Sequence, residues 1–316
     1  FDVQAGTARQ LGNNWQQMNG SWYWIENGRV ATGWRVINGK WYYLNPADGR
    51  MLTGFYKDAT GQLFYSDGSG AMLSTTGWYL LNGTWYWVNG NGSLATGWIN
   101  VGGTWYYMGE NGAMKTGWYQ VKGAWYYSNG SGAMQTGWLN RGGTWYYLTG
   151  SGAMATGWIN LGGTWYYLNP GNGDMVGSGW HLINNKWYYF GGSGAMYSNR
   201  WIGNYYVGGN GEMMTNTWVG SYWVGADGKW IPNYNPDANA NWVKSGNTWY
   251  YQRPDGSKLT NSWKRINGSW YYFGADGAMT TGWKYVDGYK FYFGTDGKMV
   301  QDVDKLIGKQ SSYRIT

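Results

Sequence analysis

Hydrophobic positions in this chain gather into short aromatic clusters that are separated by glycine-rich polar segments. Each pair of clusters starts with a Trp that follows Gly and ends with a Trp-Tyr-Tyr run, as in TGWINVGGTWYYMGENGAMK from Thr96 to Lys115. The pair recurs at a period of roughly twenty residues, which predicts a repeat architecture of about fourteen units. The first aromatic residue of each unit lies at Trp15, Trp34, Phe55, Trp78, Trp98, Trp118, Trp138, Trp158, Trp180, Trp201, Trp218, Trp242, Trp263 and Trp283.

The spacer between the two clusters of a unit has the composition of a tight turn. Asn-Gly and Gly-Gly dipeptides accept positive φ at both central positions, as a type I′ hairpin turn requires. We therefore expect each unit to be one β-hairpin. These dipeptides lie at Asn38-Gly39, Asn82-Gly83, Gly102-Gly103, Gly142-Gly143, Gly162-Gly163 and Asn267-Gly268.

The predicted turn also fixes which side chains share a face of the hairpin. A two-residue turn at Asn38-Gly39 pairs Trp34 with Tyr43. Because side chains alternate along a strand, Trp34, Trp41 and Tyr43 then lie on one face and Tyr42 lies on the other. Both faces are aromatic, and a hairpin with two apolar faces needs neighbours that cover them. We expect consecutive hairpins to stack into an all-β solenoid.

Connectors such as NGSGAM and GADGAM join the expected hairpins. Met134, Met154 and Met279 in these connectors would supply a flexible apolar plug between successive units. The alternative architecture is a β-propeller, in which two units would form one four-stranded blade with a period of about forty residues. Odd and even units do not differ here, so the pattern favours the solenoid.

Composition limits the function classes that this chain fits. Its 316 residues include 27 Trp, 31 Tyr and 56 Gly, so aromatic rings are expected to supply most of a core that is spread along the chain. There is no cysteine, which excludes disulfides and thiolate metal sites. Charged residues make up only 12% of the chain and form no Lys/Arg stripe, so the net charge of +7 does not predict nucleic acid binding. No apolar run is long enough to predict membrane insertion.

Candidate catalytic and metal-binding residues are sparse. His181 is the single histidine, and Glu26, Glu110 and Glu212 are isolated from one another. No Ser/His/Asp or paired-carboxylate arrangement is visible, which predicts a non-catalytic chain. Asp and Asn in the connectors NPADG, NPGNG and GADG resemble calcium ligands, but Asx turns explain them there. We expect no metal ion and no cofactor.

The aromatic residues are better suited to binding. In stacked hairpins, Trp98 and Trp105 of one unit would face Tyr126 of the next. Three ring faces closed by a methionine form an aromatic cage, which attracts a quaternary ammonium ion because the electron-rich faces stabilise a weakly hydrated cation. The alternative is that these rings only fill a core. Val, Ile and Leu would serve that purpose without exposing indole edges, so the use of Trp and Tyr in every unit favours a surface function.

The motif GWxxxxGxWYYxxxxGxMxTG resembles the choline-binding cell-wall repeat of Gram-positive surface proteins, autolysins and phage lysins. Near-identical copies cover Gly77 to Tyr167, and degraded copies cover nearly all of Trp15 to Met299. The resemblance implies a left-handed superhelix of hairpins that holds choline or phosphocholine groups of teichoic and lipoteichoic acids between neighbouring units, with two Trp, one Tyr and often a Met in each cage. Carried over position by position, it implies the ligand residues Trp34, Trp41 and Tyr65; Trp78, Trp85, Tyr106 and Met114; Trp98, Trp105, Tyr126 and Met134; Trp118, Trp125, Tyr146 and Met154; Trp138, Trp145, Tyr166 and Met175; Trp158, Trp165, Tyr188 and Met196; and Trp263, Trp270 and Tyr292.

Two departures from the motif predict altered sites. Phe55 and Phe64 stand as replacements for both Trp residues of the third unit, so its cage is expected to be weak or absent. From 201 to 241 the spacing changes, the second clusters GNYYVGG and GSYWVGA lack their first Trp, and two prolines enter. We expect a bend or a junction there.

The predicted domain organisation has five parts: a cap or cut linker over 1–14, hairpin repeats over 15–200, the irregular junction over 201–241, further repeats over 242–300 and a linker over 301–316. This last segment is weakly similar to the lead-in to L,D-transpeptidase domains. The similarity implies that the full-length protein continues into a wall-modifying enzyme.

Two binding functions remain open from the sequence. The first is choline-dependent attachment to the cell wall, in which a secreted protein is held at the cell surface by several weak sites on one polymer. The second is glycan binding, because related aromatic-glycine repeats occur in glucan-binding regions of glucosyltransferases and in receptor-binding regions of clostridial toxins. The strict order of Trp, Trp-Tyr-Tyr and Met favours choline.

Overall fold

A computed structural model describes residues 12–301, and these residues form only short strands, turns and connectors. Residues 1–11 of the predicted cap and 302–316 of the predicted linker lie outside the described part. The strands pair antiparallel into fourteen separate sheets of two or three strands each. No four-stranded blade occurs among the described residues, which confirms the hairpin solenoid and rules out the propeller.

Each hairpin consists of two consecutive strands, and β3 and β24 each add a short third strand. The strands are β1 Asn14–Met18, β2 Ser21–Glu26, β3 Arg29–Val30, β4 Gly33–Ile37, β5 Lys40–Leu44, β6 Gly54–Lys57, β7 Leu63–Ser66, β8 Gly77–Leu81, β9 Thr84–Val88, β10 Gly97–Val101, β11 Thr104–Met108, β12 Gly117–Val121, β13 Ala124–Ser128, β14 Gly137–Arg141, β15 Thr144–Leu148, β16 Gly157–Leu161, β17 Thr164–Leu168, β18 Gly179–Ile183, β19 Lys186–Phe190, β20 Arg200–Ile202, β21 Tyr205–Val207, β22 Thr217–Val219, β23 Tyr222–Val224, β24 Trp230–Ile231, β25 Asn241–Ser245, β26 Thr248–Gln252, β27 Ser262–Ile266, β28 Ser269–Phe273, β29 Gly282–Val286 and β30 Tyr289–Phe293.

The predicted turns and their register are confirmed. Asn38 and Gly39 have φ of 52° and 74°, as a type I′ turn requires. Across this turn Trp34 pairs with Tyr43, so Trp34, Trp41 and Tyr43 share one face of the β4–β5 hairpin. The other five predicted dipeptides also have positive φ at both positions.

The innermost residue of each regular hairpin directly follows the second aromatic cluster. Leu148 is a typical case, because it is fully buried and pairs with Gly137, which has no side chain. Aromatic rings were expected to supply most of the core, and these central positions themselves are a mixture of aliphatic residues, Met, Phe and Ser. The fully buried residues of this kind are Leu44, Val88, Met108, Ser128, Leu148, Leu168, Phe190, Phe273 and Phe293, with Ser66 in the β6–β7 hairpin.

The regular connectors are bonded both to the hairpin that they follow and to the hairpin that precedes it. After the β14–β15 hairpin, the Ala155 amide donates to the Tyr147 carbonyl at 2.8 Å, within the same unit. The neighbouring Met154 amide donates to the Trp125 carbonyl of the preceding hairpin at 2.7 Å. These local hydrogen bonds set the spacing of successive hairpins. They also satisfy the backbone N–H and C=O groups that face the gap between the hairpins.

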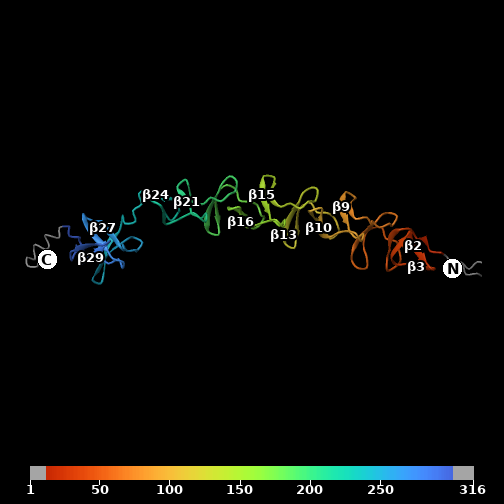
Figure 1. Cartoon of the computed structure of the whole chain (residues 1–316), viewed down its shortest axis with the longest axis horizontal. Coiled ribbons are helices and arrows are strands. Elements are labelled where there is room, and N and C mark those ends of the chain that lie inside the picture. Colours follow the sequence, from red (N-terminus) through yellow and green to blue (C-terminus); the bar gives the residue numbers. More distant parts are fainter. Residues whose placement is uncertain (1–11, 302–316) are drawn as a thin grey trace, which may run out of the picture. The chain divides into compact units, whose positions relative to one another are not determined.

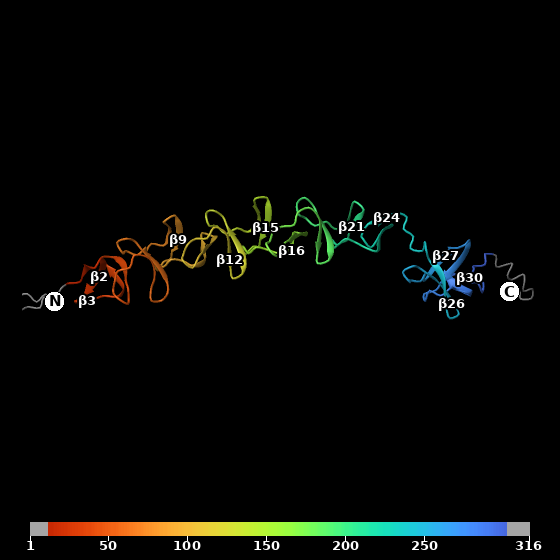
Figure 2. The ribbon, with the colours of Figure 1, turned by 180° about the vertical axis from the view of Figure 1, so that it is seen from behind.

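The chain divides into two compact units. The described part of unit 1 covers 12–200 and Val207–Glu212, and that of unit 2 covers Trp201–Tyr206 and 213–301. Within unit 1 the hairpins follow one another in sequence order from β2 to β16 (Figure 1), and the view from behind shows the same order (Figure 2).

Unit 2 contains most of the short strands β20 and β21, the strands β22 to β24 and the proline-containing insert that follows them. The insert is fixed by Asp237, whose carboxylate forms ion pairs with Arg253 at 2.8 Å and Lys264 at 2.6 Å. Burial works to raise the pKa of Asp237, but the hydrogen bonds from Lys264 and Arg253 outweigh it and hold the pKa below its usual range.

Candidate ligand-binding cages

Two Trp side chains on one face of a hairpin form the first two walls of each candidate site. In the β12–β13 hairpin, the register places Trp118 and Trp125 on the same face. Their ring centroids are 6.5 Å apart and their planes meet at 84°, so the two indoles stand nearly perpendicular. Both rings lie on one side of the sheet because side chains alternate along each strand and Trp125 pairs with Gln120, two residues after Trp118.

The next hairpin and its connector supply the third and fourth walls. The ring of Tyr146 lies 5.0 Å from that of Trp118, at 65° to it. Met154 is held by its backbone bond to Trp125 and closes the site. The resulting cavity has a volume of about 330 Å³ and is lined by Trp118, Trp125, Tyr146, Met154, Gly171 and Asn172.

This cavity is open to solvent and has no charged lining. Trp125 is 41% exposed, and Trp118 is half-buried, so neither indole is enclosed in the core. Electron-rich ring faces without a competing cation favour a weakly hydrated positive ion. The arrangement therefore suits a small organic cation that needs no hydrogen-bond partner.

The structure brings together the predicted residues of the five regular cages of unit 1. In each, the first Trp lies 4.8 to 5.0 Å from the Tyr of the next hairpin, and the connector Met donates its amide to the carbonyl of the second Trp. The groups are Trp78, Trp85, Tyr106 and Met114; Trp98, Trp105, Tyr126 and Met134; Trp118, Trp125, Tyr146 and Met154; Trp138, Trp145, Tyr166 and Met175; and Trp158, Trp165, Tyr188 and Met196.

Tyr65 was the wrong choice for the third ring beside Trp34. Phe64 lies 4.7 Å from Trp34, whereas Tyr65 contacts Phe55 within its own hairpin at 4.8 Å. The reason is that Leu63 pairs with Lys57, so Leu63 rather than Phe64 takes the place of the second Trp.

Tyr292 was wrong for the same geometric reason. Phe291 lies 4.9 Å from Trp263, while Tyr292 pairs with Trp283 in the last hairpin. Lys290 therefore occupies the second-Trp position of that hairpin, and its ammonium lies 4.8 Å from the Trp283 ring centroid. The chain's own cation thus covers this indole.

The third unit lacks the Trp pair of the regular cages. Phe55 lies 4.9 Å from Tyr86, but the remaining positions are the aliphatic Leu63 and Leu94. Tyr86 and Leu94 are buried and pack with Leu63 in one cluster. The two Trp positions of this unit are therefore held by Phe55 and Leu63 rather than by Phe55 and Phe64.

Two regular cages were missed in the sequence. One is formed by Trp15, Trp22, Tyr42 and Met51 around a cavity of about 340 Å³. The other is formed by Trp242, Trp249, Tyr271 and Met279 around a cavity of about 350 Å³. Trp15 and Trp242 both mark unit starts in the repeat pattern, so the same alternation rule, applied there, would have found them.

The irregular segment contains a different aromatic group. Trp201 lies 5.7 Å from Tyr222, and Tyr222 lies 5.6 Å from Trp230. The Trp230 amide donates to the Asn204 carbonyl at 2.7 Å, which is the bond that a Met makes elsewhere. Asn204 thus replaces the second Trp, and Trp230 replaces the Met.

Candidate metal-binding and catalytic residues are sparse in residues 12–301. No cluster of three or more His, Cys, Asp or Glu suited to a metal ion is present in this range. The His181 Nε2–H donates a hydrogen bond to the Gly177 carbonyl at 2.9 Å, and the ring packs against Phe190. Within the same range, no helix is long and apolar enough to cross a membrane.

Repeated solvent-open aromatic slots between stacked hairpins define a repeat module that binds ligands at its surface. Comparison with protein-family models identifies the family: the choline-binding repeat matches residues 31–76, 115–156, 136–180, 156–201, 195–230, 240–281 and 260–303, and the cell wall binding repeat matches 76–94 and 96–114. The chain belongs to the choline-binding repeat family and is a choline-binding, cell-wall-binding module. The repeats associate it with the cell surface.

Solved structures show the same fold. CbpJ from Streptococcus pneumoniae TIGR4 is 30% identical with a TM-score of 0.55, and the match covers 92% of this chain and 100% of that one. Choline binding protein F from Streptococcus pneumoniae is 27% identical with a TM-score of 0.51, over 93% and 100% of the two chains. That protein has also been solved in the presence of a peptidoglycan analogue, a tetrasaccharide-pentapeptide. A comparison with curated proteins found no match.

Proposed function

We propose that the chain anchors a secreted protein to choline-bearing teichoic and lipoteichoic acids, with one choline group held in each aromatic cage. The observation that carries the proposal is the repeated group of two perpendicular indoles, a third ring and a Met, in which the second indole stays about two-fifths exposed (41% for Trp125). Such a slot matches a trimethylammonium group, which has no hydrogen to donate.

The strength of binding comes from repetition. A ring contributes about 1 to 2 kcal/mol of cation–π attraction, so three rings give roughly 3 to 5 kcal/mol, or near-millimolar affinity. A polymer that carries many cholines engages several cages at once, and linked sites gain a factor of about a hundred or more through effective concentration. In this mechanism the chain itself needs no catalytic group, and the enzyme expected beyond 301–316 stays a prediction.

The proposal is tested by binding of the protein to two wall polymers, one carrying choline and one carrying ethanolamine in its place. We expect retention on the choline polymer, elution by free choline at tens of millimolar, and much weaker retention on the ethanolamine polymer, because each lost methyl group adds an N–H that loses water on entering the aromatic slot. Equal retention on both polymers would contradict choline-dependent anchoring.

A polar groove in unit 1 supports glycan binding as the second candidate function. Its volume is about 580 Å³, and Lys57, Gln62, Thr96, Tyr107 and Glu110 are among its lining residues. A groove that combines hydrogen-bonding side chains with one aromatic ring suits a sugar. Titration with a neutral glucan oligomer decides between the two: saturable glucan binding without any choline heat would favour the glycan function.

A further inference from the structure

The cage beside Trp34 is larger than three other cages and has an acidic residue in its lining. The site of Trp34, Trp41, Phe64 and Met72 encloses about 480 Å³, against 330 to 350 Å³ for the cages of Trp118, Trp15 and Trp242. Asp58 and Gln62 also line this cavity. Of the two acidic residues that line described cages, Asp58 and Asp296, the second is paired with Lys298 at 3.0 Å.

Asp58 reaches this cage because the β6–β7 hairpin has a longer loop than its neighbours. Lys57 pairs with Leu63, and residues 58–62 form the connection in place of a two-residue turn. The Asp58 amide donates to the Gln62 carbonyl at 3.0 Å, and the Gly61 amide donates back to the Asp58 carbonyl at 3.0 Å. The hairpin that lost its own Trp pair therefore supplies a polar wall to the preceding cage.

The two carboxylate oxygens of Asp58 have different surroundings. Oδ1 accepts three hydrogen bonds, from the Thr60 amide at 2.9 Å, the Thr60 hydroxyl at 2.6 Å and the Gln62 amide at 3.1 Å. Oδ2 accepts only the Trp34 indole N–H, at the long distance of 3.4 Å. Because a carboxylate oxygen accepts more than one hydrogen bond, Oδ2 keeps acceptor capacity at the wall of the cage.

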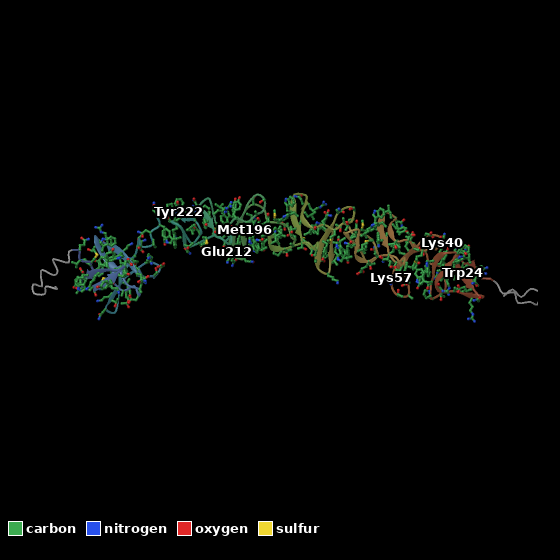
Figure 3. The ribbon with its side chains drawn as sticks, in the orientation of Figure 1. Trp24, Lys40, Lys57, Met196, Glu212 and Tyr222 are labelled. Carbon is green, nitrogen blue, oxygen red and sulfur yellow. The ribbon has the colours of Figure 1, made fainter. Side chains whose placement is uncertain are left out.

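The charge on Asp58 is not neutralised by a neighbouring side chain. In the part of the chain that the structure describes, no Lys or Arg forms an ion pair with it, and Lys57 is exposed at the surface (Figure 3). Burial works to raise the pKa of Asp58, but the hydrogen bonds from Thr60, Gln62 and Trp34 outweigh it and keep the pKa below its usual value. The group is therefore a carboxylate at neutral pH.

We infer that the cage of Trp34, Trp41, Phe64 and Met72 recognises ammonium groups that still carry an N–H, whereas the cages without an unpaired carboxylate in their lining favour fully methylated ones. This inference rests on the proposed function, in which the cages bind organic cations. A cage without such a carboxylate offers the N–H of the cation no charged acceptor, so the donor keeps only the water at the open side of the cage. In this cage the donor has an acceptor in Oδ2, and the bond is strengthened by opposite charges. The larger cavity also leaves room for the tilted pose that such a bond requires.

The test compares choline with 2-(dimethylamino)ethanol, which is protonated at neutral pH and differs from choline by one methyl group. Both are titrated calorimetrically into the whole protein and into the Asp58→Asn variant. We expect the dimethyl amine to bind one site of the wild-type protein within about threefold of choline, and the variant to lose that site by about tenfold or more. Choline binding at the same site should weaken only about two- to threefold, because the rings remain.

Asp67→Asn is the matched control. Asp67 forms the same kind of turn, in which its Oδ1 accepts the Ser69 amide at 2.8 Å, the Ser69 hydroxyl at 2.6 Å and the Ala71 amide at 3.1 Å, but it lines no described cage. The Asp67→Asn variant should bind choline and the dimethyl amine with the same affinities as the wild-type protein. Trp41→Ala should abolish the dimethyl-amine site, which assigns that site to this cage.

The possible results separate this inference from the proposed function. If choline binds several sites but the dimethyl amine shows no site that depends on Asp58, the inference is wrong and the anchoring proposal stands. If choline binds nowhere, both are wrong.

Discussion

The substitution Trp125→Ala tests the cage geometry at a single site. It removes one of the three rings around the cavity between β12–β13 and β14–β15 and leaves Trp118 and Tyr146 in place. Loss of one ring removes about 1 to 2 kcal/mol of cation–π attraction. Affinity for choline at this site should therefore fall about five- to thirtyfold.

The same substitution should leave the hairpin folded. Trp125 is 41% exposed, so its truncation removes less buried apolar surface than a core Trp would, and we expect a loss of about 1 to 2 kcal/mol in the free energy of unfolding. The bond from the Met154 amide to the residue 125 carbonyl survives, because alanine keeps that carbonyl. Circular dichroism and thermal melting should show a nearly unchanged protein.

Calorimetric titration with choline is the decisive measurement for this variant. The site beside residue 125 should disappear from the millimolar range while the other sites keep their affinity. Retention on a choline-bearing polymer should fall further than the free-choline signal, because linked sites multiply one another's contribution to the overall affinity. Tyr289→Ala is the control, since Tyr289 is 73% exposed and lines no described cage. An unchanged number of choline sites in Trp125→Ala, with the fold intact, would refute the cage geometry.

Two further predictions concern packing and pH. Gly173→Ala should cost about 1 to 2 kcal/mol of stability and weaken choline binding beside Met154. The reason is that Gly173 has φ of 75° and an added Cβ would lie 2.5 Å from the Met154 sulfur. Gly150→Ala is the control: Gly150 has open space around it, so thermal melting should show no change. Burial raises the pKa of Tyr56 to about 12 despite its 2.9 Å hydrogen bond with Ser66, so its contribution to stability is complete below pH 10 and is lost as the pH rises through about 12. Thermal melts of Tyr56→Phe should therefore lack part of the alkaline loss seen in the wild-type protein, and identical alkaline profiles would contradict this assignment.

The regular repeats were predictable because their chemistry is local. Asn38-Gly39 fixed a two-residue turn, and the turn fixed the pairing of Trp34 with Tyr43, which the structure confirms. From that register, strand alternation correctly placed Tyr146 of the next hairpin opposite Trp118.

Prediction failed where a hairpin changed its loop length or its cluster composition. Because of the longer connection at 58–62, Phe64 occupies the position of the middle Tyr rather than that of the second Trp. Phe291 likewise occupies the middle-Tyr position, because Lys290 stands where the second Trp is expected. Residue type alone did not reveal this one-position offset, because Phe64 and Tyr65 are both aromatic and fit either face of the hairpin equally well. Only pairing partners decide which face a residue takes.

The buried centre was also not visible from residue type. Leu148 follows a cluster of three aromatic residues, yet it is fully buried while Trp145 is 42% exposed. Burial here follows the position opposite Gly137 rather than hydrophobicity, since the pairing partner without a side chain leaves space for its neighbour.

The reach of each connector governs how such a protein can change length. Because the Met154 amide bonds back to Trp125 and no farther, a duplicated or deleted stretch that spans one whole period restores every contact at its two borders. A stretch of any other length would leave an indole facing the wrong partner. Gene copies can therefore lengthen or shorten the array in discrete steps, one pocket at a time, without redesign of the rest.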